Sequence, residues 1–349
     1  MLQIDLPIPT EFGWCLLSEL ALGDKVYGPD GRLTPVVAIS AIRTAHDIYE
    51  LGFDDGAQFL TSAEHLWVVE RKTRRRVAGS SSQGLDRRQY RERVRITVRE
   101  IGAHDHHWDN RLAIPINAPL VMPDAVLPVP PYTLGAWLGD GHSNSARLTC
   151  AYADYEIVEA VRAEGVRVAE VASSNQASGL YSLDCGQRGR KGTGMTTVLR
   201  SLGLLHNKHI PLLYQRGATV QRLELLRGLM DTDGHCNTRG TATFVNSNER
   251  LADDVFDLAA GLGLKPSKYA YFGAKKPYWQ VAFQAYQALN PFRLSRKANR
   301  AKVGARPSPR RYIIGCSRIG SALVRTVKLQ REDGLFLVGH HMVATHDMA

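Results

Sequence analysis

Two stretches of the chain share one pattern, in which apolar and small residues alternate and an Asp-Gly pair closes the run. They are Thr133 to Gly141 (TLGAWLGDG) and Leu226 to Gly234 (LRGLMDTDG). Glycine inside a helix costs about 1 kcal/mol relative to alanine, so its presence in these runs suggests that another backbone must approach closely. We therefore predict two helices that pack against each other, with Asp140 and Asp233 at their C-terminal ends.

The residues at these predicted helix ends suggest a metal site. Gly141 and Gly234 suit the left-handed conformation that often follows a helix C-terminus. The helix macrodipole disfavours negative charge at that end, and two neighbouring carboxylates also repel each other. A divalent cation between Asp140 and Asp233 would relieve both effects, and oxygen ligands suit Mg²⁺. The alternative is that the two runs are unrelated buried helices ending in Asp-Gly turns.

The residues after each run repeat the same order of expected elements. A strand over 146–152 and a helix over 155–164 follow the first run, and a strand over 241–246 and a helix over 248–262 follow the second. This internal repeat occupies residues 132 to about 300.

The two ends of the chain show a different pattern of short apolar strands separated by turn residues. Residues 1 to about 70 contain closely spaced Gly, Pro and Asp, and residues 301–349 return to strand-like composition. The predicted fold class is therefore α+β. We expect an all-β domain, formed by residues 1–112 and 301–349, that is interrupted by a repeat domain over 132–300. A proline-rich linker over 113–131 joins them.

The two Asp-Gly runs resemble the paired motifs of LAGLIDADG homing endonucleases in their single-chain, two-repeat form. The first copy departs from the family pattern by having Leu138 where the family often has an acid. The resemblance implies αββαββα repeats, and it implies a double-strand cut made with Mg²⁺ or Mn²⁺. It implies catalytic roles for four residues, which are Asp140, Asp233, Lys208 and Lys297. It also implies a set of metal ligands, which are Asp140, Asp233, Gly139 and Thr232. The alternative for both lysines is an ordinary surface position.

The flanking segments resemble the Hint domain of inteins, in the third mechanistic class found in replicative helicases. The resemblance rests on Thr61, His65 and Trp67 near the start and on the segment Thr345-His346-Asp347 near the end. It implies that the nuclease is inserted within a splicing domain. A lone His beside a Trp is otherwise more often a packed, hydrogen-bonded residue than a catalyst.

The residues at the splicing positions predict that splicing is lost. The family's third class uses a Cys where this chain has Thr326, and a threonine hydroxyl is a much poorer nucleophile than a thiol. The terminal Asn is replaced by Asp347, whose carboxylate is ionised at neutral pH and cannot attack as the side-chain amide does. The next residue, Met348, has no nucleophile, whereas His65, Trp67 and His346 are retained.

Charge indicates a polyanionic partner. The net charge is +10 and the pI is about 9.4, and basic residues concentrate in an insertion over about 71–99. We expect double-stranded DNA to be bound there through phosphate contacts. The candidate residues are Arg71, Lys72, Arg74, Arg75, Arg76, Arg87, Arg88 and Arg91.

Composition adds several expectations. The five cysteines show no metal spacing and are expected to be reduced thiols of a cytoplasmic protein that is bacterial or phage-encoded. No apolar run reaches the roughly 18 residues that span a membrane, and no signal peptide is evident. We expect a monomer with internal pseudo-two-fold symmetry. Two alternatives to an intein-derived endonuclease are a self-splicing class three intein and a nuclease-dead regulator that binds nucleic acid.

Overall fold

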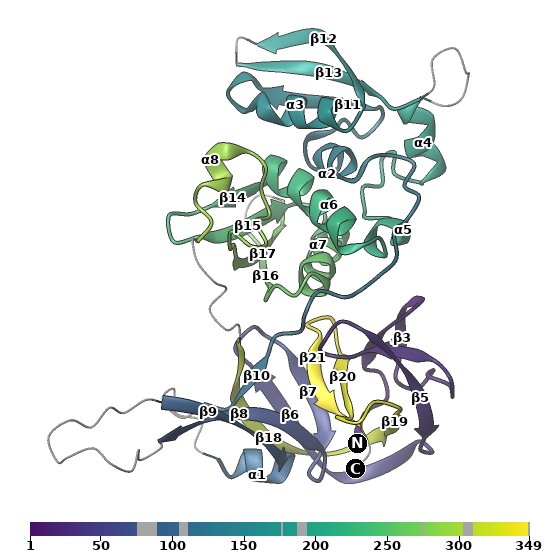
Figure 1. Ribbon diagram of the computed structural model, residues 1–349, viewed down its shortest axis with the longest axis vertical. Helices are drawn as coiled ribbons and strands as arrows, with labels where there is room; N and C mark the ends of the chain where they lie inside the picture. The colour runs from purple at the N-terminus through teal and green to yellow at the C-terminus, as the bar shows by residue number, and fades with distance from the viewer. Residues whose placement is uncertain are drawn as a thin grey trace, which may run out of the picture. The chain divides into compact units, whose positions relative to one another are not determined.

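A computed structural model describes residues 1–74, 89–104, 111–175, 177–186, 194–273, 276–302 and 310–347. The chain divides into two compact units, Met1–Leu120 with Ser308–Ala349 and Val121–Pro307 (Figure 1). The first unit is therefore assembled from both ends of the chain. Residues 113–120, which we assigned to the linker, belong to this unit because Ala113–Pro115 pair with strands of its sheet.

The first unit consists almost wholly of β-structure in the part of the chain that the structure describes. Its elements before the insertion are β1 (Leu2–Gln3), β2 (Pro7–Thr10), β3 (Gly13–Leu16), β4 (Lys25–Tyr27), β5 (Leu33–Ile39), β6 (Arg43–Phe53), β7 (Gln58–Ser62), β8 (Leu66–Arg74), β9 (Gln89–Thr97), α1 (Val98–Gly102) and β10 (Ala113–Pro115). Those after it are β18 (Arg310–Arg325), β19 (Val327–Leu329), β20 (Leu335–Val338) and β21 (Val343–His346).

Pairing between the two ends of the chain holds this unit together. Its described strands form one sheet in the order β1-β7-β6-β18-β10-β8-β9, a second in the order β19-β5-β4-β2-β3, and the hairpin β20-β21. β1 also pairs with β18, so that β1, β7, β6 and β18 close on themselves. The long strand β18 thereby connects the N-terminal and C-terminal parts.

The second unit contains the predicted repeat. Its first half is α2 (Pro131–Asp140), β11 (Arg147–Ala151), a short 3₁₀ helix (Tyr152–Asp154), α3 (Glu156–Ala163), β12 (Arg167–Asn175), β13 (Ser178–Asp184), α4 (Met195–Ser201) and α5 (Leu212–Gln215). Its second half is α6 (Thr219–Thr232), β14 (Gly234–Cys236), β15 (Thr241–Asn246), α7 (Glu249–Gly261), β16 (Ser267–Tyr271), β17 (Tyr278–Gln284) and α8 (Ser295–Ala298).

The two halves have the same sheet topology. The described strands of the second half are ordered β14-β15-β17-β16. Those of the first half are ordered β11-β13-β12, and a bridge between Gly141 and Leu148 takes the place of β14. The αββαββα order and the α+β fold class that the sequence predicted are therefore confirmed.

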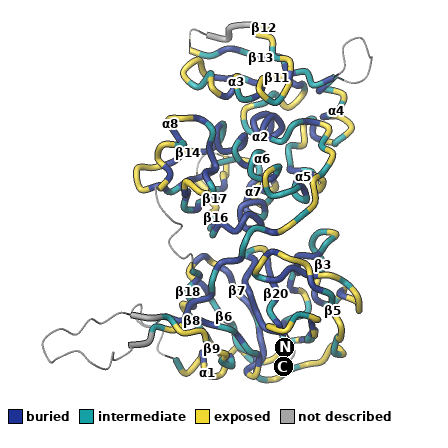
Figure 2. The backbone as a smooth tube through the Cα atoms, viewed as in Figure 1, coloured by how far each residue is buried: buried dark blue, intermediate teal, exposed yellow. Residues whose placement is uncertain are grey.

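Helices α2 and α6 pack directly on each other at the centre of the second unit, as the glycine pattern predicted. A Cβ added at Gly135 would lie 2.2 Å from the carbonyl oxygen of Leu225, and one at Gly228 would lie 2.1 Å from that of Tyr132. Only hydrogen fits at these positions. Helix α2 is buried over most of its length and α6 over half of it (Figure 2), and their apolar side chains form part of one core with both sheets.

This close approach gives a direct test of the helix packing. We expect Gly228→Ala to destabilise the protein by about 3 kcal/mol, because the methyl group would collide with backbone atoms that cannot rotate away. Gly273→Ala is the control, since no atom lies within 4 Å of the added methyl, and its effect should stay within about 0.5 kcal/mol. Denaturant unfolding of the two variants measures the difference, and equal stabilities would contradict the packing.

Candidate active site

The C-terminal ends of α2 and α6 also touch. A Cβ at Gly139 would lie 2.0 Å from the Oγ1 atom of Thr232. The Thr232 hydroxyl donates to the Gly228 carbonyl at 2.9 Å, which holds it against its own helix. The contact places Asp140, the last residue of α2, near Asp233, the first residue after α6. The two acids lie close enough that Asp140 raises the pKa of Asp233.

The glycines that follow the acids do not adopt the predicted left-handed conformation. Gly141 has φ −74° and ψ 151°, and Gly234 begins β14 with no positive φ. The prediction was wrong because each chain passes straight from helix into an extended segment. Space requires glycine instead: an added Cβ would lie 2.2 Å from the Trp137 carbonyl oxygen at Gly141 and 2.5 Å from that of Met230 at Gly234.

The two carboxylates are both harder to ionise than ordinary aspartates. Burial and the charge of Asp140 raise the pKa of Asp233 to about 6, although Asn246 donates a 2.7 Å hydrogen bond to its Oδ2 atom. Asp140 is exposed as a residue, yet protein atoms around its carboxyl group raise its pKa, while Lys208 and Lys297 oppose the shift. The pair therefore carries unfavourable negative charge that a cation would relieve.

Each half supplies a lysine to the end of its own motif helix. Nζ of Lys208 donates to the carbonyls of Gly139 (2.9 Å) and Gly141 (2.7 Å). Nζ of Lys297 lies within 3.3 Å of four carbonyl oxygens, which belong to Met230, Asp231, Thr232 and Gly234. Burial lowers the pKa of each lysine to about 8. Lys297 is only 4% exposed, so the alternative of an ordinary surface lysine is wrong for it.

These lysines perform two electrostatic tasks at once. Their ammonium groups neutralise the carbonyl ends of the helix dipoles. They also lie close enough to the two acids for each group to shift the pKa of the other. Asp233 and Asp140 both favour the charged form of Lys208, and both lysines favour the charged form of Asp233. The site is therefore a compact arrangement of two carboxylates and two ammonium groups at the ends of two packed helices.

The donor set fits a divalent cation at the carboxylates. Two acids that repel each other in a partly dehydrated position are the groups that a hard cation stabilises. The backbone carbonyls of Gly139 and Thr232, which the resemblance also implies as ligands, already accept from Lys208 and Lys297. Each carbonyl has a second lone pair, so a cation can still approach them.

Sequence reasoning missed Asp231, which lies where the first copy has Leu138. Its side chain is 1% exposed and accepts from the Tyr132 hydroxyl at 2.8 Å. It also accepts from the backbone N–H groups of Arg293 and Leu294 at 3.1–3.2 Å. Asp231 thus ties α6 to the segment that carries Lys297. The acidic residue within the motif was a usable signal for this role.

The predicted splicing residues meet in the first unit. A cavity of about 420 Å³ is lined in part by Met1, His65, Thr326 and Asp347. The Nδ1 atom of His65 lies 3.0 Å from the nitrogen of Met1, and its Nε2 atom lies 2.7 Å from the Thr345 hydroxyl. Burial lowers the pKa of His65 well below its usual value, so His65 is neutral at physiological pH.

The other splicing positions lie beside this cavity or support it. The side chain of Asp347 accepts from the Leu329 backbone N–H at 2.9 Å, and Nδ1 of His346 lies 3.2 Å from the Asp347 carbonyl oxygen. The Trp67 ring meets the His65 ring edge-on with centroids 5.8 Å apart. The buried Thr61 hydroxyl donates to the Ser62 carbonyl at 3.2 Å.

The basic insertion lies only partly within the described residues. Arg71 pairs with Glu92 at 3.4 Å, Lys72 faces Arg91 across the β8–β9 ladder, and the Arg91 guanidinium lies 5.5 Å from the centroid of the Tyr312 ring. Arg74 ends β8, but its side chain is outside the description. Four of the predicted contacts fall outside the described residues, namely Arg75, Arg76, Arg87 and Arg88.

Comparison with known proteins supports the interpretation of the second unit. The model of the family described as LAGLIDADG-like domain matches residues 220–317, which begin within α6 and include the second half of the repeat. The chain carries a LAGLIDADG-like domain. The Hint-type residues gather around one cavity in the first unit, which is the arrangement expected of an intein that carries such a domain.

One relative aligns with almost the whole length of this chain. It is 34% identical, over a 361-residue alignment, to the replicative DNA helicase DnaB of Mycobacterium intracellulare, and the alignment covers 99% of this chain. The chain spans 58% of that protein's length. A second match, to the replicative DNA helicase DnaB of Mycobacterium leprae (strain TN), is 35% identical over 66 residues, which are 19% of this chain and 11% of that protein.

The solved structures that match this chain include inteins and a homing endonuclease. The MchDnaB-1 intein (N145AA) is 13% identical, with all of both chains covered and a TM-score of 0.33. The homing endonuclease I-DmoI in complex with DNA and Ca is 12% identical, with 45% of this chain and 83% of that chain covered and a TM-score of 0.31.

None of the helices in the described parts of the chain is long and apolar enough to cross a membrane.

Proposed function

We propose that the LAGLIDADG-like domain cuts double-stranded DNA at a specific site. Each half would supply one carboxylate and one lysine for the cleavage of one strand. The observation that carries this proposal is the convergence of Asp140, Asp233, Lys208 and Lys297 on the touching ends of α2 and α6. Two acids and two buried ammonium groups are poorly suited to a purely structural core, because each is costly to dehydrate.

The chain's own groups divide the work. Asp140 and Asp233 would hold Mg²⁺ or Mn²⁺, which when bound supplies the charge that activates water and stabilises the leaving oxygen. Lys208 and Lys297 would keep positive charge beside the phosphate that is attacked and hold the helix ends rigid. We propose a monomer with pseudo-two-fold symmetry, since both halves lie in one chain. Arg71, Lys72 and Arg91 of the first unit would add phosphate contacts.

Metal dependence tests this proposal together with its pH dependence. A chelator should abolish cleavage, and added Mg²⁺ or Mn²⁺ should restore it. Because the pKa of Asp233 is about 6, protons compete with the metal below that pH, and the metal affinity should fall by up to about tenfold per pH unit. Calorimetric titration with Mg²⁺ between pH 5 and 8 measures this. Cleavage that persists in the chelator would overturn the metal assignment.

Protein splicing is the second candidate function, and the shared cavity of His65, Thr326 and Asp347 favours it. We propose that splicing is lost, because Thr326 and Asp347 stand where a thiol and an amide are needed. We expect one unprocessed species when the chain is expressed between short tagged flanks and weighed by intact mass. Ligated tags with a released chain would show that splicing persists.

A further inference from the structure

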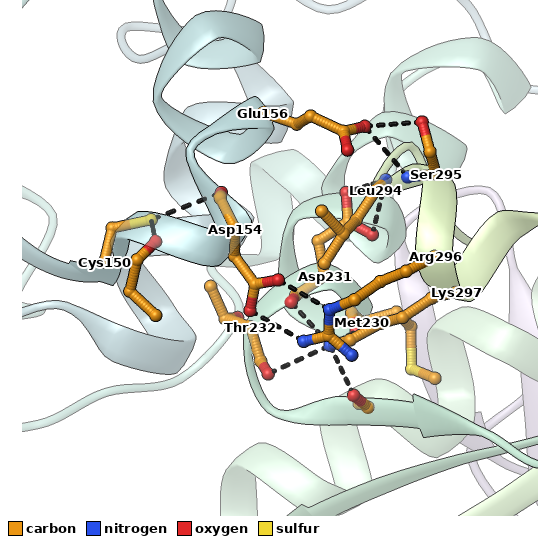
Figure 3. Close-up of polar contacts among 12 residues, drawn as sticks. Cys150, Asp154, Glu156, Met230, Asp231, Thr232, Leu294, Ser295, Arg296 and Lys297 are labelled. Carbon is orange, nitrogen blue, oxygen red and sulfur yellow. Dashed lines mark hydrogen bonds and ion pairs between the residues drawn. The ribbon is translucent and has the colours of Figure 1, made fainter. Parts of the chain in front are cut away.

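The segment that carries Lys297 is held by the other half of the domain. The Ser295 backbone N–H and hydroxyl both donate to Oε2 of Glu156, at 2.9 and 2.6 Å. The Arg296 guanidinium donates two hydrogen bonds to the Asp154 carboxylate, at 2.6 and 2.7 Å. Figure 3 shows both pairs beside Lys297. Asp154 and Glu156 belong to the first half, whereas α8 and Lys297 belong to the second.

The segment that carries Lys208 is held in the same manner from the opposite side. The Asn248 side chain, at the N-terminus of α7, donates to the Lys208 carbonyl at 2.7 Å. Farther along α7, Asp254 accepts from the Ile210 backbone N–H at 2.7 Å and from the Gln215 side chain at 3.0 Å. Each lysine segment therefore rests on polar groups at the start of the second helix, or within it, in the other half.

We propose that these reciprocal contacts set the position of each lysine at its cleavage centre, so that each half controls the strand cut that depends on the other half's lysine. Asp154 and Arg296 act as positioning residues for Lys297, and Asp254 acts as a positioning residue for Lys208. This inference rests on the proposed endonuclease function for its catalytic consequence, although the contacts themselves can be tested without DNA.

The geometry explains why a surface contact matters for catalysis. The Asp154–Arg296 ion pair is partly exposed, with 56% of the Arg296 side chain and 17% of the Asp154 side chain accessible, and such a pair adds little to global stability. Arg296 is, however, the neighbour of Lys297, whose ammonium group must meet four carbonyl oxygens within 3.3 Å. A small shift of α8 would break several of these bonds at once. A misplacement of about 1 Å can lower an enzymatic rate by about a hundredfold.

The competing interpretation is that Arg296 contacts a DNA phosphate and that Asp154 merely occupies it in the free protein. The two interpretations predict opposite behaviour for the matched pair Asp154→Asn and Arg296→Ala. If the ion pair positions Lys297, both variants have the same defect. If Arg296 binds phosphate, Arg296→Ala weakens DNA binding and reduces its salt dependence, whereas Asp154→Asn strengthens binding.

Lysine reactivity tests the positioning without DNA. The purified full chain is treated with a limiting acetylating reagent, and modification of Lys297 and Lys208 is followed by peptide mass spectrometry. We expect Asp154→Asn and Arg296→Ala to raise the Lys297 rate at least fivefold with little change at Lys208, and Asp254→Asn to do the reverse. Asp253→Asn removes only a surface ion pair with Lys268 and should leave both rates unchanged. Equal rates in all variants would overturn the proposal.

Strand-resolved cleavage of a plasmid that the wild-type protein cuts tests the consequence. We expect Asp154→Asn and Arg296→Ala to slow one strand at least tenfold and to accumulate nicked circles, and Asp254→Asn to slow the opposite strand. Equal slowing of both strands, or opposite effects of Asp154→Asn and Arg296→Ala on binding, would contradict the proposal. If these variants change lysine reactivity but the wild-type protein cuts no DNA, the endonuclease function is rejected and the positioning role of the contacts stands.

Discussion

Replacing Asp140 or Asp233 with asparagine should abolish DNA cleavage, with a loss of at least about a thousandfold, while leaving DNA affinity largely intact. Asparagine keeps the size of the side chain but removes the charge that holds a divalent cation. Cleavage and gel-shift assays on the same duplex separate the two effects. Undiminished cutting by either variant would refute the assignment of that acid.

The same substitution at Asp233 should stabilise the fold. The pKa of Asp233 is raised to about 6 by burial and by Asp140, so the folded state binds a proton more tightly than the unfolded state. Folding stability therefore falls as the pH rises from about 4 through 6 and stays lower above 6. Asp233→Asn should be more stable than the wild type above pH 6, on the order of 2 kcal/mol, and the gain should shrink toward pH 4.

The pH course of this gain distinguishes a functional acid from a structural one. Thermal unfolding of the wild type and of Asp233→Asn at pH 4, 6 and 8 gives the comparison. A variant that is less stable than the wild type at pH 8 would indicate that the Asp233 carboxylate serves the fold, through Asn246 or another partner. A gain in stability with a loss of cutting is what a charge retained for chemistry produces.

Removing Lys297 should have the second largest effect. Lys297→Met leaves the carbonyl groups of Met230, Asp231, Thr232 and Gly234 without this donor and removes a cation from the end of α6. We expect a loss of about 3 kcal/mol in stability together with a fall of at least about a hundredfold in the rate of one strand cut.

Lys208→Met is the matched comparison for this variant. Lys208 is less buried and donates to two carbonyl groups, so its loss should cost less, about 1–2 kcal/mol. It should slow the other strand cut. Denaturant unfolding and strand-resolved cleavage measure both quantities. A larger stability loss for Lys208→Met than for Lys297→Met would contradict the roles that we derive from the hydrogen bonds.

The sequence predicted the helix pair and the repeat because both depend on local pattern. Glycines at 135 and 228 have no use in a helix except to admit another backbone, and the structure places a carbonyl oxygen at each. The repeat was visible because each Asp-Gly run is followed by the same order of strand and helix. The first domain was predicted from turn spacing, whereas its closure through β18 depends on pairing between distant segments.

Other features could not be read from local pattern. The conformation of Gly141 depends on the strand segment that follows it, so a helix-ending glycine was the wrong expectation. The four-carbonyl environment of Lys297 is created by α6 and β14 together, and spacing alone left its role open. The contacts of Asp154 and Asp254 join residues from opposite halves, and no short-range signal in the sequence marks such pairs.

The central claim is that the two helix ends form one centre that cuts both strands. The most direct measurement is deep sequencing of DNA ends after a randomised duplex library is incubated with the full chain and Mg²⁺, beside the Asp140→Asn, Asp233→Asn double variant. The account predicts breaks in both strands at a fixed offset within one long shared sequence, and none with the double variant. Identical end profiles for the wild type and the double variant would contradict it.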